Sequence, residues 1–173
     1  MENFIREIET STPALIEVLD NLSEEQSKFK INSMVWSIHE CMEHIVISEI
    51  GVYRILMTHN EEAPQHENPE KLGKEKIAKI LGNRTVKSES PENVRPIGRF
   101  SNLDELKAKF HSNRQRICDG LRNNEFVFDN QLFKHPVLGE LTKKDWLNFL
   151  IHHARRHLKQ IEEIRSFIQF QMI

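Results

Sequence analysis

The sequence has few cysteines, glycines and prolines, and it has no long apolar run. Only two cysteines occur among 173 residues, Cys41 and Cys118, which excludes a disulfide framework and a Cys-x-x-Cys motif. No strictly apolar run exceeds three residues, so we expect no membrane span, and the first residues lack the basic-then-apolar pattern of a secretory signal. Six glycines and six prolines favour long helices over many short strands. The expected compartment is a reducing cytoplasm.

An excess of basic charge is also absent. Lys plus Arg number 24 and Asp plus Glu 26, a net charge of −2, which excludes the strongly basic surface of a dedicated nucleic-acid binder. Charged residues make up 29% and hydrophobic residues 38%, which is not a disordered composition. At roughly 150 residues per domain, the length predicts a single domain over residues 1–173. Such a domain buries enough surface to fold without disulfides or metals.

Apolar residues recur at three- and four-residue steps in four long segments, which predicts four long helices. Ser37 and Glu40 form a capping box before the second, and Ser101 and Thr142 open the third and fourth in the same way. Pro13 either kinks the first helix or marks its first turn. The predicted long helices cover about residues 4–22, 38–58, 103–122 and 142–168, with shorter helical pieces at 23–29 and 74–81.

The two links between these helices differ in character. Residues 59–100 form a long polar connector with four prolines, and a connector of this length can leave the helices on either side parallel. Residues 123–141 carry enough apolar side chains to be packed rather than loose. The expected fold is therefore an all-α four-helix bundle with a long connector between its second and third long helices.

Histidine is the unusual residue type, with nine in the chain. At about 100° per residue, His153 and His157 project within roughly 40° of each other, so they can hold one ion. His152 lies about 140° from His157 and should face solvent. On the helix that begins after Ser37, His44 lies at the edge of the apolar stripe and can supply a third ligand, whereas His39 lies on the other flank.

Three imidazoles from two helices would leave coordination positions open, as catalytic metal sites do. Because three neutral ligands leave the ion's charge uncompensated, such a site favours hydroxide or a substrate thiolate in the open position. A carboxylate-rich di-iron site is disfavoured, since the last helix has no Glu-x-x-His. The alternative is that these histidines only pack and form hydrogen bonds.

Two segments of the chain resemble the DinB/YfiT-like family of metal-dependent bundle proteins. The first, Trp36-Ser37-x-x-Glu40-x-x-x-His44, is similar to the family's opening of the second helix. The second lies before and within the last helix and reads His135-Pro136-x-x-Gly139-x-Leu141, then His153-x-x-x-His157-x-x-Gln160-Ile161. Their order and spacing extend the resemblance over essentially the whole chain.

The resemblance implies an up-down-down-up bundle in which His44, His153 and His157 hold one divalent ion. Nickel and zinc are the usual candidates, with manganese and iron as further ones. Some members of the family are S-transferases for low-molecular-weight thiols, others are labelled as metal-dependent hydrolases, and many have no known reaction. A homodimer is a further expectation from the resemblance.

Other residues near these motifs are weaker candidates for the site. Glu40, one turn before His44, is the nearest candidate for a general base or a ligand-orienting carboxylate. Gln160 either hydrogen-bonds a ligand or metal-bound water, or is a polar residue at the helix edge. His135 and Ser48 are candidates for contact with a substrate, against the alternatives of a loop residue and a packing residue. Cys41 is expected to be a small buried hydrophobe.

The sequence leaves three hypotheses open. The first is a metal-dependent enzyme with a small-molecule substrate, either a thiol S-transferase or a hydrolase, and no nucleic-acid or membrane partner. The second is a non-catalytic metal-binding or stress-associated protein, and the third is a bundle that binds no ion. A group of basic residues is expected to form a solvated face that can attract an acidic substrate: Lys143, Lys144, Arg155 and Arg156.

Overall fold

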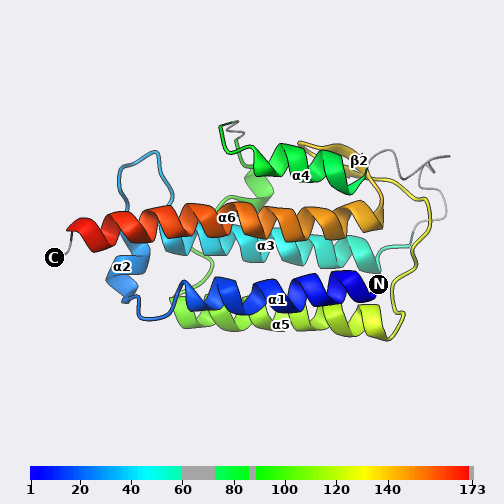
Figure 1. Cartoon of the computed structure of the whole chain (residues 1–173), viewed down its shortest axis with the longest axis horizontal. Coiled ribbons are helices and arrows are strands. Elements are labelled where there is room, and N and C mark those ends of the chain that lie inside the picture. The colour runs from blue at the N-terminus through cyan, green and yellow to red at the C-terminus, as the bar shows by residue number, and fades with distance from the viewer. Residues whose placement is uncertain (60–72, 86–88, 172–173) are drawn as a thin grey trace.

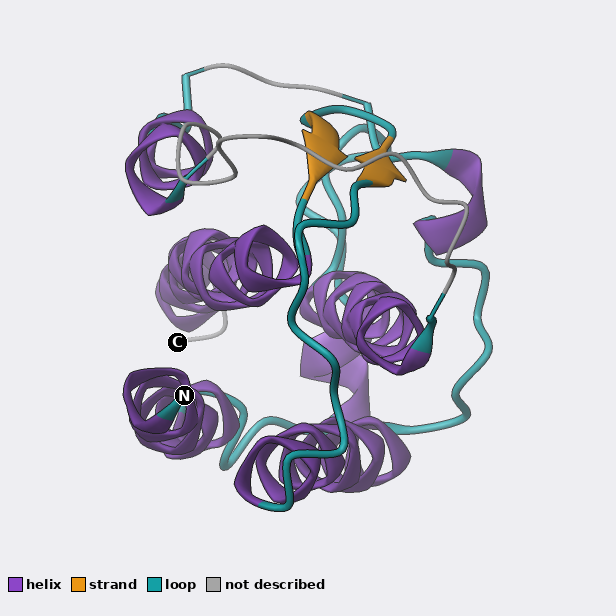
Figure 2. Ribbon diagram, turned by 90° about the vertical axis from the view of Figure 1, so that its right-hand side faces the viewer, coloured by secondary structure: helices purple, strands orange, loops and turns teal. Residues whose placement is uncertain are grey.

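The computed structural model describes residues 1–59, 73–85 and 89–171, and four long helices run along its long axis (Figure 1). In chain order the elements are α1 (Glu2–Glu17), α2 (Glu24–Lys28), α3 (Ile38–Met57), α4 (Lys74–Gly82), the 3-10 helix η2 (Glu92–Val94), α5 (Leu103–Arg122), β1 (Phe133–His135), β2 (Gly139–Leu141) and α6 (Lys143–Gln171). Helices α1 and α6 run one way and α3 and α5 the other (Figure 1). This confirms the up-down-down-up bundle. Seen nearly end-on, α4 and the two strands lie outside the four long helices (Figure 2).

Side-chain caps fix where the long helices begin. The hydroxyl of Ser37 accepts a hydrogen bond from the backbone N–H of Glu40, whose carboxylate accepts one from the N–H of Ser37. Thr142 and Asp145 make the same exchange before α6. The prediction for α5 was off by one residue: Asn102, rather than Ser101, is its cap.

Two further predictions for the helices need correction. Helix α1 begins at Glu2 and continues through Pro13, so this proline does not mark the first turn. The helix also ends at Glu17, about one turn before the predicted end, and Asn21 follows with a positive φ of 65°. The short helices after Ser23 and Gly73 are present as expected. Pro64 and Pro69 of the connector lie outside the described residues.

The link between α5 and α6 is packed, as predicted, but it also contains a hairpin that the sequence analysis did not predict. Phe126 and Leu132 are buried, and β1 pairs antiparallel with β2. His135 faces Gly139 across the turn, and Gly139 has a φ of +81°, which glycine adopts without strain. Within the described residues, the bundle therefore carries a small two-stranded sheet at its side.

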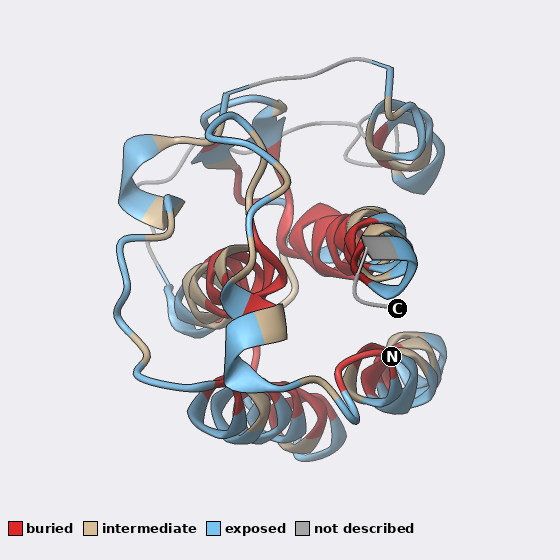
Figure 3. Ribbon diagram, turned by 90° about the vertical axis from the view of Figure 1, so that its left-hand side faces the viewer, coloured by how far each residue is buried: buried red, intermediate tan, exposed pale blue. Residues whose placement is uncertain are grey.

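The core consists of two apolar clusters with a polar layer between them. The buried faces of the long helices turn toward one another (Figure 3). One cluster holds Val52 of α3 and Ile151 of α6, and the other holds Val46 and Ala154 of the same helices. On α6, His153 lies in the gap between the clusters.

The rest of this layer is a buried ion pair. The guanidinium of Arg114 on α5 binds the carboxylate of Glu49 on α3 at 2.7 Å. It also donates to the hydroxyls of Ser11 and Thr12 on α1 at 2.9 and 3.2 Å. The four long helices thus all contribute polar groups to the middle of the bundle. Among the described residues, no helix is both long enough and apolar enough to cross a membrane.

Candidate metal centre

Three buried histidines from two helices meet inside the bundle. Nε2 of His153 lies 3.0 Å from Nε2 of His44 and 3.1 Å from Nε2 of His157. The three candidate ligand atoms all lie within 4.8 Å of one another, and each residue is less than 9% exposed. The structure thus brings together the three residues that the sequence selected. The arrangement can hold one metal ion.

In two of these rings, those of His44 and His157, a hydrogen bond at Nδ1 fixes which nitrogen carries the proton. Nδ1 of His44 lies 2.8 Å from the backbone oxygen of Val94, which can only accept a hydrogen bond. Nδ1 of His157 lies 3.0 Å from Oε1 of Gln160 and donates to it in the same way. In a neutral imidazole with its proton on Nδ1, the lone pair is on Nε2. The Nε2 lone pairs of His44 and His157 therefore both face His153.

This arrangement of protons fits a metal ion better than it fits a hydrogen-bonded cluster. Nε2 of His153 has at most one proton, so it can donate to one of the two neighbouring lone pairs and not to both. Its Nδ1 is buried and makes no hydrogen bond with the described residues. A cation between the three Nε2 atoms would accept all three lone pairs at once. Catalytic zinc sites likewise have three protein ligands, which in some of them are three histidines, and keep a further position open.

Burial keeps these imidazoles neutral, the form that binds metals. Burial lowers the pKa of His157 to about 3, with a further contribution from His44. Burial, and then the neighbouring His157 and His44, hold the pKa of His153 well below its usual range. Burial also lowers the pKa of His44, although the hydrogen bond to Val94 works against this.

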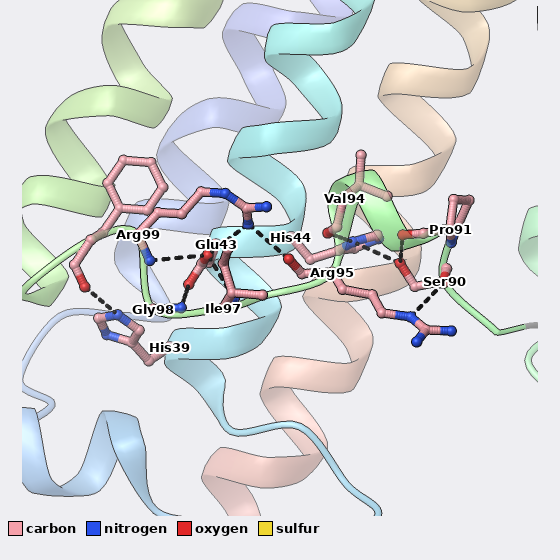
Figure 4. A network of polar contacts seen from close by, with 11 residues as sticks. His39, Glu43, His44, Ser90, Pro91, Val94, Arg95, Ile97, Gly98 and Arg99 are labelled. Atoms are coloured by element: carbon pink, nitrogen blue, oxygen red, sulfur yellow. Dashed lines mark hydrogen bonds and ion pairs between the residues drawn. The ribbon is translucent and has the colours of Figure 1, made fainter.

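The residue before His44 holds the connector against the site. The carboxylate of Glu43 accepts hydrogen bonds from the backbone N–H groups of Ile97, Gly98 and Arg99 at 3.0 to 3.2 Å, and from the Arg99 guanidinium at 2.9 Å (Figure 4). These bonds hold the pKa of Glu43 below its usual value although burial, the largest single effect, raises it. This clamp holds the segment that presents the carbonyl of Val94 to Nδ1 of His44. Sequence reasoning missed Glu43, because its partners lie more than fifty positions away in an irregular segment.

Aromatic rings surround the three imidazoles. The ring of Trp36 lies 4.9 Å from that of His44 and stacks on His157 at 6.3 Å. On the other side, the ring of Phe149 stacks on His153 at 4.8 Å. Trp36 stood out in the sequence only as the first residue of a family-like motif, and Phe149 had no sequence signal. Both belong to the wall of the site.

The weaker candidates occupy different places. Gln160 orients His157, as described above. The carboxylate of Glu40 caps α3 and pairs with Lys30 at 2.9 Å. Ser48 is buried one turn after His44. His135 packs its ring 4.6 Å from that of Phe149.

The hydrogen bonds of His135 define its state. Its Nδ1 accepts from the backbone N–H groups of Val137 and Leu138, both at 3.1 Å, so the proton of the neutral ring is on Nε2. Burial lowers the pKa of His135 to about 4. His135 thus fixes the turn of the hairpin while its ring extends the aromatic wall.

The residues expected to point away from the site behave in two ways. His39 hydrogen-bonds the carbonyl of Phe100 at 3.2 Å, on the other flank of α3 as predicted. His152 is half-buried, so the prediction that it faces solvent was wrong. Cys41 is fully buried, and burial raises the pKa of its thiol, which fits the expected small hydrophobe.

The basic face expected around α6 does not form. Lys143 is buried, with its ammonium 5.8 Å from the centre of the Phe133 ring. Arg155 pairs with Glu7 at 3.1 Å. Arg156 donates to backbone oxygens at the end of α4, at 2.8 and 3.1 Å. Three of the four side chains are thus engaged with the protein.

The fold and the site together define a class: helical bundles with a cluster of three histidines able to hold a metal. The sequence profile of the DinB superfamily matches residues 7–161, so the chain belongs to that superfamily. It is 26% identical over 151 residues to the uncharacterized protein YuaE of Bacillus subtilis (strain 168), an alignment that covers 87% of this chain and 90% of YuaE. No solved structure matches the chain.

Proposed function

We propose that this protein binds one divalent metal ion through Nε2 of His44, His153 and His157, and uses it to activate a low-molecular-weight thiol. Nickel and zinc are the candidates that the family resemblance favours, with manganese and iron as further ones. The observation that carries the metal site is the proton arrangement. Val94 and Gln160 leave lone pairs on the inward nitrogens of His44 and His157, which both face His153.

The chemistry follows from an uncompensated positive charge in an apolar setting. A divalent ion on three neutral ligands acts as a Lewis acid that lowers the pKa of a thiol or a water molecule in its open position. The rings of Trp36 and Phe149 exclude water from two sides of the ligands, which strengthens the attraction for an anion. The site therefore favours a small nucleophile that arrives with, or acquires, negative charge.

The carboxylates on this part of α3 favour a thiol over water. Hydrolysis needs a general base within hydrogen-bond reach of the water. Glu40 is engaged by the backbone of Ser37 and by Lys30, and Glu43 by Arg99 and the backbone next to it. A thiol, with a pKa near 8.5, can lose its proton to solvent without such a base.

In the proposed S-transfer the thiol proton passes to bulk water, and the sulfur electron pair forms a bond to an electrophilic carbon. The leaving group on that carbon departs with its own electron pair. The described residues contribute by holding the ion, by orienting its histidine ligands and by excluding water from around these ligands. The alternative activity is hydrolysis at the same site, and the non-catalytic alternative is metal binding alone.

A matched pair of ligands tests the thiol proposal. Metal-loaded protein is titrated by calorimetry with N-acetylcysteine and with N-acetylserine, which differ only in sulfur against oxygen. We expect the thiol to bind and the alcohol not to bind. Metal-loaded protein should also accelerate the reaction of the thiol with 1-chloro-2,4-dinitrobenzene. Equal binding of the two ligands, or ester hydrolysis without thiol transfer, would contradict the proposal.

A further inference from the structure

A hollow of about 320 Å³ lies between α3 and α5, away from the histidines. Its lining includes Tyr53 and Arg54 from α3. These two residues follow His44 by nine and ten positions, which is about 14 to 15 Å along the helix axis at about 1.5 Å per residue. The volume is at the lower end of the range of small-molecule sites, about 300 to 1,000 Å³. The hollow is thus a separate feature, large enough for a small metabolite.

The described residues that line this hollow carry positive charge only. They include Arg54 on α3 and Lys109 and Arg116 on α5, and no carboxylate is among them. Within residues 1–59, 73–85 and 89–171, no ion pair involves any of these three cations. The whole chain carries more acidic than basic residues, 26 against 24. Three unpaired cations around one hollow therefore form a local positive site in a slightly acidic protein.

One of the cations is held in place by packing. The guanidinium of Arg116 lies 4.3 Å from the centre of the Tyr53 ring. Tyr53 in turn makes an edge-to-face contact with Phe126, with the ring centres 6.1 Å apart. A guanidinium stacked in this way keeps its N–H groups available at its edge, where they can grip a carboxylate or a phosphate.

A buried amide in the same lining lacks a partner. Asn113 is 3% exposed, and its Nδ2 makes no hydrogen bond with the described part of the chain. It lies one helical turn from both Lys109 and Arg116 on the same face of α5. Buried amide N–H groups in native proteins almost always have an acceptor, so this amide can gain one by turning toward a ligand oxygen in the hollow that Asn113 lines.

We propose that this hollow binds a small organic anion that carries two or more phosphate or carboxylate groups. Arg54 and Arg116 face it from the two helices and bind separate anionic groups, and Lys109 adds a third cation. The amide of Asn113 donates to one ligand oxygen. The side of the Tyr53 ring not covered by Arg116 offers an apolar contact to the body of the ligand.

Calorimetric titration with pyrophosphate and with citrate, at low ionic strength, tests the site with one phosphate and one carboxylate probe. We expect at least one of the two probes to bind with a Kd of about 1 mM or lower, and more tightly than inorganic phosphate. The double variant Arg54→Gln/Arg116→Gln should bind the probe more weakly, by a factor of about ten or more. The control Lys144→Gln/Lys159→Gln removes the same two charges from exposed positions elsewhere and should bind like the wild type.

Asn113→Leu separates binding from stability. Because Nδ2 of the amide has no partner among the described residues, its loss should leave the melting temperature unchanged or higher while weakening the binding of the anion. In ¹⁵N spectra of the wild type, the probe should shift the side-chain signal of Asn113. Equal weakening in the control double variant, or no binding of either probe, would overturn the proposal. So would a wild-type dimer that Arg54→Gln/Arg116→Gln converts to monomers without any anion bound, because the hollow would then be a contact between copies.

Discussion

The backbone oxygen of Val94 lies 2.8 Å from Nδ1 of His44, and this contact sets the direction in which His44 presents its lone pair. Val94 belongs to the connector, fifty residues further along the chain. The connector stays in place because Glu43, the neighbour of His44, binds three of its backbone N–H groups (Figure 4). One helix thus carries both a candidate ligand and the residue that holds the ligand's hydrogen-bond partner.

Weakening this clamp should weaken metal binding without removing a ligand. For Glu43→Gln we expect metal affinity to fall about tenfold, because partners that orient ligands typically contribute 10- to 100-fold. Competition with a chromophoric chelator measures the affinity, and circular dichroism checks the fold. Glu89→Gln is the matched control, since it removes an exposed carboxylate paired with Arg95 in the same segment. Equal affinities of the two variants would show that the clamp does not act on the site.

The partner of His157 allows a test in both directions. Gln160→Leu removes the acceptor for Nδ1 of His157 and should lower metal affinity about tenfold. Gln160→Glu replaces it with a carboxylate, which orients a ligating histidine and raises its basicity, so affinity should be kept or increased. The same chelator competition measures both. If both substitutions weaken binding equally, the contact between Gln160 and His157 does not tune the ligand.

The buried imidazoles should make the metal-free protein sensitive to acid. The folded-state pKa of His157, about 3, is below its unfolded value, so the unfolded state binds more protons as the pH falls and stability is lost below about pH 6.5. Between pH 7.5 and 5.0, this residue alone should lower the free energy of unfolding by about 2 kcal/mol. Urea unfolding with a chelator present, on wild type and His157→Gln, measures it. The decrease in the free energy of unfolding over this pH range should be about 2 kcal/mol smaller in the variant than in the wild type. Identical decreases would show that His157 is not the source of the acid sensitivity.

The local parts of this account could be predicted from sequence. Capping residues such as Ser37 and Thr142 act within one turn, and the spacing of His153 and His157 is a property of one helix, so both are visible in the sequence. The Glu43 clamp and the Trp36 wall depend on which distant segments meet, which helical periodicity does not encode. The same reason explains Lys143, which looked like a solvated lysine but is buried beside the ring of Phe133. The hairpin was missed because its strands are short and lie in a link without helical periodicity.

The ion pair between Glu49 and Arg114 should behave as a coupled unit. Either Glu49→Leu or Arg114→Leu leaves one buried charge unpaired and should lower the free energy of unfolding by about 3 to 5 kcal/mol. The double variant Glu49→Leu/Arg114→Leu removes both charges and should be markedly more stable than either single variant. Urea unfolding of the four proteins completes the cycle. Additive losses would mean that the two charges do not depend on each other.

The central claim is that His44, His153 and His157 hold a metal ion, and elemental analysis by plasma mass spectrometry tests it most directly. Tag-free protein purified without added metal is compared with His153→Ala/His157→Ala and with the control His152→Ala, which removes a neighbouring histidine outside the cluster. The account predicts about one divalent ion per chain in the wild type and the control. The double variant should lose the ion and keep its helical circular dichroism. Wild-type protein with no metal above background, even after incubation with nickel, zinc or manganese, would contradict the claim.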